Sequence, residues 1–314
     1  MLSSEVFQPM SSNIRTDLAL EATELWREGV PAGADSISAP IPGVESGEEQ
    51  RGKFRVTTVK VLDERGEQAL NKPRGSYVTV ELDALIRREE NAFPDAVALV
   101  SEKLRELMKM VKSDSCLVAG LGNEAITPDA IGPQTIKSVL VTRHLKQTMA
   151  KEFEFFREVS ATRSGVLGTT GVESAELIDA LARMLRPSQI IAIDALASRK
   201  AERLCRTVQM TDTGIVPGSG VGNHRAALNS ATLGVPVIAI GVPTVVDAAT
   251  LAVELARQAG VGDLGETDFG EAGRMIVTPR DIDSSVHDIA KLVGYAIDVA
   301  LHDGLTIEDI DMFL

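Results

Sequence analysis

The chain has few thiols and few aromatic rings. Only two cysteines, Cys116 and Cys205, occur among 314 residues, so a disulfide framework and a four-thiolate metal site are both excluded. Aromatic residues make up 4% of the sequence, while 44% of it is hydrophobic. The core must therefore consist of Ala, Val, Leu and Ile, a composition typical of parallel strands that helices cover on both faces.

Long apolar runs and an excess of positive charge are also missing. No stretch is long enough to span a bilayer, and the N-terminus lacks the apolar segment of a secretion signal. We therefore expect a cytoplasmic protein without a membrane partner. Lys and Arg number 32 against 45 Asp and Glu, a formal charge of −13. This charge predicts no direct nucleic-acid binding; it either attracts basic partners or serves solubility alone.

Several common catalytic motifs are absent. The sequence contains no Gly-Lys-Ser/Thr, which excludes a P-loop, and no Gly-x-Ser-x-Gly elbow, which disfavours a serine hydrolase. No His-Glu-x-x-His occurs, so a zinc peptidase is disfavoured as well. The histidines are scattered without the spacing of metal ligands, at His144, His224, His287 and His302.

Helical and extended patterns alternate from Pro94 to the C-terminus. This alternation predicts a doubly wound, mostly parallel α/β sheet flanked by helices. The expected helices are 94–111, a segment with Ile136, Val139 and Leu140, 175–185, 245–259 and 284–301, and the expected strands are 115–119, 189–193, 235–240 and 275–277.

The N-terminal part follows a different pattern. Residues 1–17 are polar and predict a loosely held arm, and the segment 18–26 predicts a helix that Asp17 could cap. The Gly/Pro/Ser-rich segment 30–52 predicts a long surface loop. Apolar residues then suggest strands near 54–61 and 77–82, which predict an added antiparallel hairpin in a subregion of about residues 50–90.

Two predicted strands each deliver an aspartate at or just past their ends. Asp129 follows the strand 115–119, and Asp194 follows the strand 189–193. In an open parallel sheet, ligands and chemistry gather beyond the carboxyl ends of the strands. Two acids placed there could share a proton and activate water. The bland alternative for Asp129 is helix capping, whereas a carboxylate at the end of a buried strand such as Asp194 needs partners.

Two glycine-rich turns accompany these acids. Gly120, Gly122 and Asn123 follow the first strand. Ala125 is compatible with a dinucleotide-binding turn, but Pro128, Pro133 and the lack of a nearby strand that ends in an acid disfavour it. The second turn contains the glycines Gly218, Gly220 and Gly222, and Asp212 precedes it as a third candidate acid. Each turn is either a tight loop that needs positive φ or a backbone wall that lets a peptide approach closely.

At these residues the chain resembles the germination protease family of spore-forming bacteria. The matching segments cover nearly the whole chain and include 120–123 with 127–133, 141–145, 194–199 and 212–223. The resemblance implies an endopeptidase that degrades small acid-soluble spore proteins when germination begins, in the forespore and spore core. It also implies a fold similar to that of the hydrogenase maturation proteases, whose Gly-x-Gly-Asn turn and downstream acid match the residues from Gly120 to Asp129.

The resemblance further implies roles for individual residues. The family's proposed catalytic aspartates fall on Asp129 and Asp194. Family members are inactive precursors, form homotetramers and lose a short N-terminal segment, so we expect a pro-segment over residues 1–17 and a single α/β peptidase domain over 18–314. No further His or Cys commits the site to nickel or zinc; we expect no metal ligands and no cofactor, and metal dependence stays open.

The segment Thr16-Asp17-Leu18-Ala19-Leu20-Glu21 imitates the sequence at which family substrates are cut. These substrates are cleaved after the first acid of a Thr-Glu-Phe-Ala-Ser-Glu-like sequence. The resemblance therefore predicts pro-segment cleavage between Asp17 and Leu18. An ordinary capped helix is compatible with the same residues.

Three functions remain in competition at this point. The first is a peptidase that uses the Asp129 and Asp194 pair as acid and base. The second keeps the peptidase fold but makes the two acids metal ligands. The third is an acidic protein without catalytic activity that binds and sequesters basic spore proteins.

Overall fold

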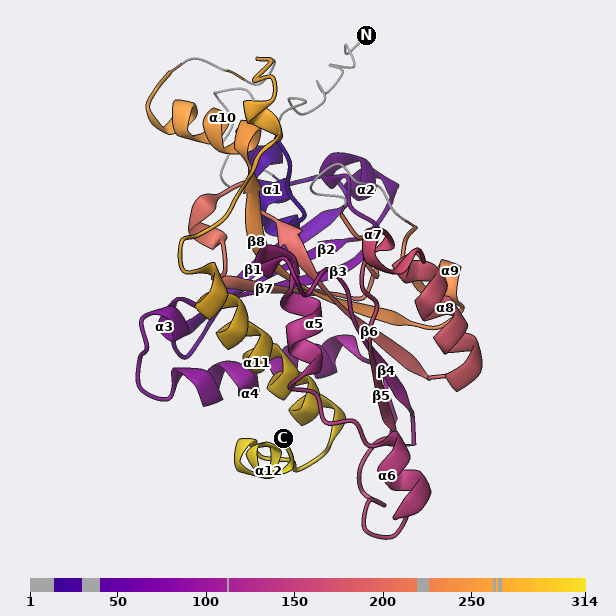
Figure 1. Ribbon diagram of the computed structural model, residues 1–314. Helices are drawn as coiled ribbons and strands as arrows, with labels where there is room; N and C mark the ends of the chain where they lie inside the picture. Colours follow the sequence, from indigo (N-terminus) through magenta and orange to yellow (C-terminus); the bar gives the residue numbers. More distant parts are fainter. Residues whose placement is uncertain (1–13, 30–39, 112, 219–225, 262–263, 265–266) are drawn as a thin grey trace.

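A computed structural model describes residues 14–29, 40–111, 113–218, 226–261, 264 and 267–314. It contains a nine-stranded mixed sheet flanked by helices (Figure 1), in the order β1-β2-β3-β7-β8-β6-β4-β5, with β9 paired to β8. The predicted α/β class is confirmed. The strands are β1 Val44–Arg51, β2 Phe54–Val61, β3 Gly75–Glu81, β4 Cys116–Gly120, β5 Val159–Arg163, β6 Gln189–Ala197, β7 Thr207–Thr211, β8 Val237–Asp247 and β9 Ile276–Val277.

The helices cover both faces and both ends of this sheet. None of them, within the described residues, is long and apolar enough to cross a bilayer. The α-helices are α1 Ala19–Glu28, α2 Glu64–Leu70, α3 Asp83–Ile86, α4 Ala92–Leu107, α5 Ile131–Ile136, α6 Arg143–Thr148, α7 Leu167–Thr170, α8 Ser174–Leu185, α9 Ser230–Leu233, α10 Ala248–Gln258, α11 Ile282–Leu301 and α12 Ile307–Phe313. The short 3₁₀ helices include η1 Thr127–Asp129, η2 Ala201–Arg203 and η4 Ala272–Arg274.

The strands β5, β4, β6 and β8 form the predicted parallel part of the sheet. Both β6 and β8 are longer than expected. β6 continues past Asp194 to Ala197, so Asp194 lies inside the strand and not after its end. β8 continues through Gly241 and Pro243 to Asp247, and the register with β6 shifts there. The helix predicted from residue 245 therefore begins only at Ala248.

The antiparallel part of the sheet is larger than the predicted hairpin. β1 pairs with β2, β2 with β3 and β3 with β7, each time antiparallel, and β7 pairs antiparallel with β8. The prediction of a long loop over 30–52 is wrong for Val44–Arg51, which forms β1 and pairs with β2 along its full length. The tight hairpin is thus β1–β2, whereas α2 lies between β2 and β3. Exposed charged residues on β1 suit an edge strand that must not pair further.

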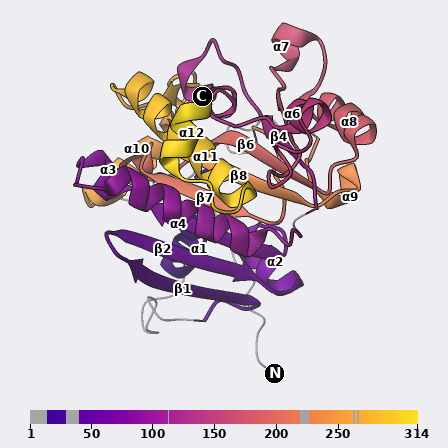
Figure 2. The same cartoon turned by 90° about the horizontal axis from the view of Figure 1, so that it is seen from below.

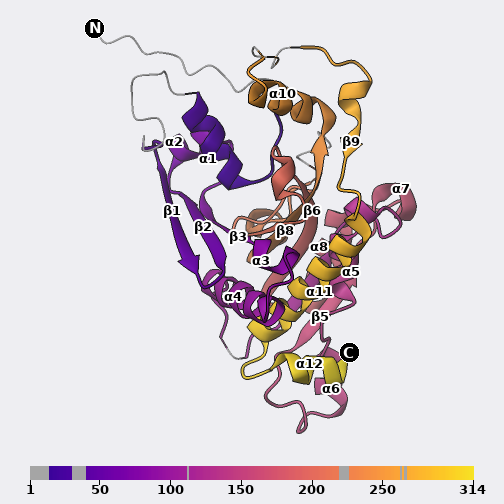
Figure 3. The ribbon, with the colours of Figure 1, turned by 90° about the vertical axis from the view of Figure 1, so that its left-hand side faces the viewer.

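The largest part of the core lies on one face of the sheet. It packs α4, α5 and α11 against aliphatic residues such as Ile191, Ile193 and Ile240. Figures 2 and 3 show α4 lying between the β1–β2 hairpin and α11. On the opposite face, α8 packs against the residues that alternate with these along the strand, such as Ile190 and Ala192. Alternate residues of β6 therefore face different surroundings, which fixes the face on which Asp194 lies.

A buried histidine lies near the C-terminus, at the end of the sheet away from α10. His302 Nδ1 accepts a hydrogen bond from the Arg157 amide at 3.1 Å, and its ring packs on Phe156. His302 Nε2 is buried with no hydrogen-bond partner among the residues that the structure describes. Burial lowers the pKa of His302 from 6.5 to about 4. His302 is therefore neutral in the folded protein at pH 7.

We predict that this histidine makes stability depend on pH. The unfolded chain protonates His302 near pH 6.5 and the folded chain only near 4, so its contribution is complete above 6.5 and is lost as the pH falls towards 4. When the pH falls from 7.5 to 4.5, the unfolding free energy of the parent should drop by about 2 kcal/mol more than that of His302→Asn. The Asn side chain keeps an acceptor but cannot be protonated. Denaturant unfolding at both pH values measures this difference.

Asp298 changes the stability in the opposite direction. Burial raises its pKa, so the folded protein holds this proton more tightly than the unfolded chain, and its contribution to stability grows as the pH falls. It is present in both proteins and cancels in their difference. An equal loss of stability in parent and variant would contradict the assignment to His302.

Candidate active site

Asp194 lies in a row of residues that crosses three strands. Gln209 on β7 pairs with Gly241 on β8, and Gly241 pairs with Asp194 on β6. Residues paired side by side in a sheet point to the same face, so the Gln209 and Asp194 side chains flank Gly241. Asp194 is 5% exposed, and its Oδ1 accepts the amide of Ala195 at 2.9 Å. The Leu196 side chain fills the space over Gly241, since a Cβ there would lie 2.3 Å from Leu196 Cδ1.

One edge of β6 is uncovered beyond Ile193. β4 ends at Gly120, which pairs with Ile193, and one further hydrogen bond joins the Leu121 amide to the Ile193 carbonyl. The backbone amides of Ala195 and Ala197 therefore lie past the end of β4. Backbone donors in such a position need other acceptors.

Asp129 comes to this place on a tightly packed turn. Its Oδ2 accepts the Asn123 amide at 2.8 Å. Gly122 has φ +105°, and a Cβ there would lie 2.1 Å from the Asp129 carbonyl oxygen. A Cβ on Gly120 would lie 2.4 Å from the Gly132 carbonyl oxygen. Gly120, Gly122 and Asn123 thus hold the turn that carries Asp129.

The structure brings the turn of Asp129 to the strand of Asp194. A Cβ on Gly132 would lie 2.6 Å from the carbonyl oxygen of Ile193, the residue before Asp194. The Thr244 hydroxyl of β8 donates to the Pro128 carbonyl, the residue before Asp129, at 2.6 Å. Asp129 therefore follows β4, and Asp194 lies within β6 just past the point at which β4 ends.

Of the other predicted site residues, the structure describes Asp212 and Gly218. Asp212 lies at the end of β7, exposed, and its Oδ1 accepts the Ser76 amide at 2.8 Å, which ties β7 to β3. Gly218 has φ +73° and permits a turn that other residues rarely adopt. The predicted residues Gly220 and Gly222 lie outside the described residues.

Asp17 docks on the uncovered edge of β6. Its amide donates to the Ala197 carbonyl at 2.9 Å, and its carboxylate accepts the Ala197 amide at 2.8 Å. Asp17 is therefore not the cap of α1, as the sequence suggested; the helix begins at Ala19 after Leu18, without a side-chain cap. The prediction of a loosely held arm is wrong for residues 14–17, which pack here, while residues 1–13 lie outside the described residues.

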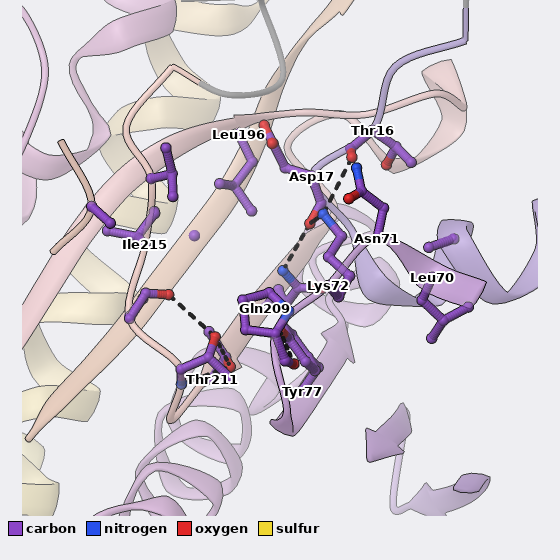
Figure 4. Close-up of a pocket in the computed structure, with 18 of the residues that line it drawn as sticks. Thr16, Asp17, Leu70, Asn71, Lys72, Tyr77, Leu196, Gln209, Thr211 and Ile215 are labelled. Carbon is purple, nitrogen blue, oxygen red and sulfur yellow. Dashed lines mark hydrogen bonds between the residues drawn. The ribbon is translucent and has the colours of Figure 1, made fainter. Parts of the chain in front are cut away.

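The peptide bond after Asp17 is held on both sides (Figure 4). The Asp17 carbonyl oxygen accepts hydrogen bonds from Lys72 Nζ at 3.0 Å and from Gln209 Nε2 at 3.3 Å. The Leu18 amide donates to Thr16 Oγ1 at 3.0 Å, and Leu18 is fully buried. A cavity of about 380 Å³ adjoins this segment; its lining includes Asp17, Lys72, Leu196, Gln209 and Gly241.

Glu21 is a fully buried carboxylate that one short loop surrounds with donors. It accepts hydrogen bonds from the amides of Arg199 and Lys200, at 2.6 and 3.0 Å, and from the Ser198 hydroxyl at 2.8 Å. Arg203 Nη1 adds an ion pair at 3.0 Å. The carboxylate therefore anchors α1 to the end of β6.

A second ion pair network joins α1 to α10. Arg199 is 1% exposed; its Nη2 lies 2.7 Å from Glu28 and its Nε lies 2.8 Å from Glu254. Figure 1 shows both helices at the same end of the sheet. The segment 16–21 is thus fixed between the sheet edge and these helices.

Comparisons with known proteins give the family. The family model "Germination protease" matches residues 19–256. The chain belongs to the germination protease family. A germination protease of Clostridium tetani is 42% identical, over 96% of this chain and 99% of its own. Those of Caldanaerobacter subterraneus and Oceanobacillus iheyensis are 40% and 33% identical, each over 96% of this chain and 98% of their own.

A solved structure also matches part of this member of the germination protease family. It is the NiFe hydrogenase maturation protease HycI from Thermococcus kodakarensis KOD1, with a TM-score of 0.35 and 14% identity. The match covers 62% of this chain and 98% of the other.

Sequence reasoning missed three residues of the site in this germination protease family member. Lys72, Gln209 and Arg203 lie outside the segments that suggested an active site, and no motif marks them. Lys72 and Gln209 reach Asp17 through the pairing of β3, β7 and β8, whereas Arg203 reaches Glu21 from η2, which follows β6. Within the described ranges, no group of three His, Cys, Asp or Glu residues is placed to hold a metal ion together.

We predict that Glu21 carries more of the stability of α1 than its neighbour Glu24. Glu24 lies on the same helix and also binds Arg203, but its side chain is 24% exposed. Burial raises the pKa of Glu24, but Arg203 and Lys200 outweigh this and lower it to about 2. Glu21→Ala leaves buried donors unpaired and should cost about 3–5 kcal/mol. Glu24→Ala should cost about 1–2 kcal/mol.

Denaturant unfolding of the two variants beside the parent measures both losses at neutral pH. A loss in Glu21→Ala no larger than that in Glu24→Ala would contradict the anchoring role. Glu45→Ala on the exposed edge strand β1 serves as the control and should leave the unfolding free energy unchanged within about 0.5 kcal/mol.

Proposed function

We propose that the protein is an endopeptidase that begins the degradation of small acid-soluble spore proteins during germination. The family membership supports a protease acting at this stage. The observation that carries the proposal is the docking of the chain's own segment 16–21, in which Asp17 binds the edge of β6 at Ala197, three residues past Asp194. A peptide that lies along an uncovered strand edge gains backbone hydrogen bonds, and the adjoining cavity takes its side chains.

We further propose that Asp129 and Asp194 work as an acid and base pair. One carboxylate takes a proton from the attacking water, while the other donates a proton to the leaving amine. The two negative charges favour a shared proton at mildly acidic pH. Asp129 follows β4 and Asp194 lies in β6 beyond the end of β4; these positions support the mechanism, because the docked peptide contacts the same edge of β6.

The protein as made would be an inactive precursor. Asp17 occupies part of the edge of β6 that a substrate would need, so the segment blocks its own site. Cleavage between Asp17 and Leu18 at mildly acidic pH would remove residues 1–17 and open it. We also propose a homotetramer, which light scattering at micromolar concentration tests; a monomer would contradict it.

Two alternative functions are distinguished from the acid pair mechanism by experiment. In the first, Asp129 and Asp194 bind a metal ion, which metal analysis of the purified protein would detect. In the second, the acidic protein binds basic spore proteins without cutting them. Incubation with a purified spore protein, read on a gel, separates binding from cleavage.

We predict that Asp129→Asn and Asp194→Asn each lower the rate of spore protein cleavage by about 10²–10⁴-fold, because Asn keeps the shape but cannot exchange the proton. The matched control is Asp212→Asn. Asp212 binds the Ser76 amide, and an Asn side chain keeps an acceptor there. If Asp129→Asn or Asp194→Asn cut the spore protein at nearly the parent rate, the assignment of the two residues as an acid and base pair would be wrong.

We predict that the full chain processes itself. Mass spectrometry after incubation at mildly acidic pH should show loss of residues 1–17 in the parent, while Asp129→Asn stays full length. Glu21→Gln should slow the cut, because the neutral amide fits the donors around Glu21 poorly. Processing of Asp129→Asn without added protease would refute self-cleavage and leave the peptidase assignment intact.

A further inference from the structure

The carbonyl group of Asp17 is bound by two side chains from different parts of the sheet (Figure 4). Lys72 lies between α2 and β3, and Gln209 lies on β7. Their nitrogen atoms are 3.0 and 3.3 Å from the Asp17 oxygen, and Lys72 Nζ is also 3.4 Å from the Thr16 oxygen. A peptide carbonyl oxygen has two lone pairs and can accept two hydrogen bonds; here one of the two donors is charged, which favours negative charge on the oxygen.

We propose that Lys72 and Gln209 form an oxyanion clamp, which stabilises the negative charge on the carbonyl oxygen of the peptide bond that is cut. The inference rests on the proposed function, in which the Asp17–Leu18 bond occupies the place of a substrate bond. Water adds to the carbonyl carbon, and the electron pair of the double bond moves to the oxygen. The oxygen returns the pair when the carbon–nitrogen bond breaks and the amine leaves with a proton from the acid pair.

The position of Gln209 matches this role. Its Oε1 accepts the Ala19 amide at 2.7 Å, which directs the Nε2 donor towards the Asp17 oxygen. Gln209 and Asp194 lie on either side of Gly241 in the same row of the sheet. With strands about 4.8 Å apart, the two backbones are about 10 Å from each other. The Leu196 side chain covers Gly241, because a Cβ there would lie 2.3 Å from Leu196 Cδ1. Gln209 and Asp194 therefore lie on either side of the Leu196 side chain.

Lys72 supplies the charge that an amide cannot. The residue is half-buried, since part of its surface lies at the rim of the cavity, while its ammonium group is enclosed. Burial lowers the pKa of Lys72, and the nearby charges of Asp17 and Glu21 act in the opposite direction. A preorganised donor in such an enclosed place stabilises an oxyanion more strongly than water does.

The simpler alternative is that Lys72 only anchors the N-terminal segment. The two roles differ in what they do to the rate of self-cleavage. An anchor can be removed elsewhere: Thr16→Val loses the hydrogen bonds of Thr16 Oγ1 to Leu18 and Glu21 without touching the Asp17 oxygen. A clamp acts only at the Asp17 oxygen.

The test is the first-order rate of loss of residues 1–17 from the full-length chain at one mildly acidic pH, followed by mass spectrometry. Lys72→Met, which keeps the length but not the charge, should slow the rate by about 10²–10³-fold. Lys72→Arg should recover part of that loss, and Thr16→Val should change the rate less than tenfold. Gln209→Met provides an independent test with an expected loss of about 10-fold or more.

Thermal unfolding accompanies each rate, so that a variant that does not fold is recognised; in that event the Gln209→Met rate decides. Parent-like rates in a folded Lys72→Met chain, or equal losses in Lys72→Met and Thr16→Val, would overturn the clamp and leave the proposed function standing. A parent chain that neither processes itself nor cuts a spore protein would refute both.

Discussion

The site depends on an unequal pair of neighbouring strands. β4 stops at Gly120 while β6 continues to Ala197, which leaves part of the β6 edge without a strand beside it. Backbone donors on that edge must be satisfied by side chains or by another peptide. The Asp194 carboxylate accepts the hydrogen bond of the Ala195 amide, and the Asp17 carboxylate accepts that of the Ala197 amide. The same gap thus places an acid and a docked peptide next to each other.

The rest of the site is built to hold a peptide against this edge. Glu21 is surrounded by the loop 198–200 and Arg203, and the aliphatic core on the other face keeps β6 in place. The segment after the docked bond is helical from Ala19 onward. A substrate that binds in the same way would combine one extended residue with a helical turn, and not a long extended strand.

Apolar runs in the sequence indicated the strands near Asp129 and Asp194, but not where each strand ends, since β6 continues past Asp194 to Ala197. Parallel strands bring their carboxyl ends to one edge, and the pairing of these two acids stays a prediction. β1 was missed because its polar residues are exposed on both faces and lack the alternation that marks a strand. Lys72 and Gln209 were missed for a different reason. They meet at the Asp17 oxygen through pairings between distant strands, and no local pattern records such a meeting.

The buried state of Leu18 has a consequence for the direction of the proposed cut. Hydrolysis after Asp17 would create a new α-amino group on Leu18, which ordinarily carries a positive charge with a pKa of about 8. That charge would arise in a fully buried position, at the N-terminus of α1 and near the Lys72 ammonium group. Helix N-termini and neighbouring cations both repel positive charge. The Leu18 end would therefore be driven out of its buried position as soon as it forms, whereas the new carboxylate of Asp17 would keep an attractive partner in Lys72.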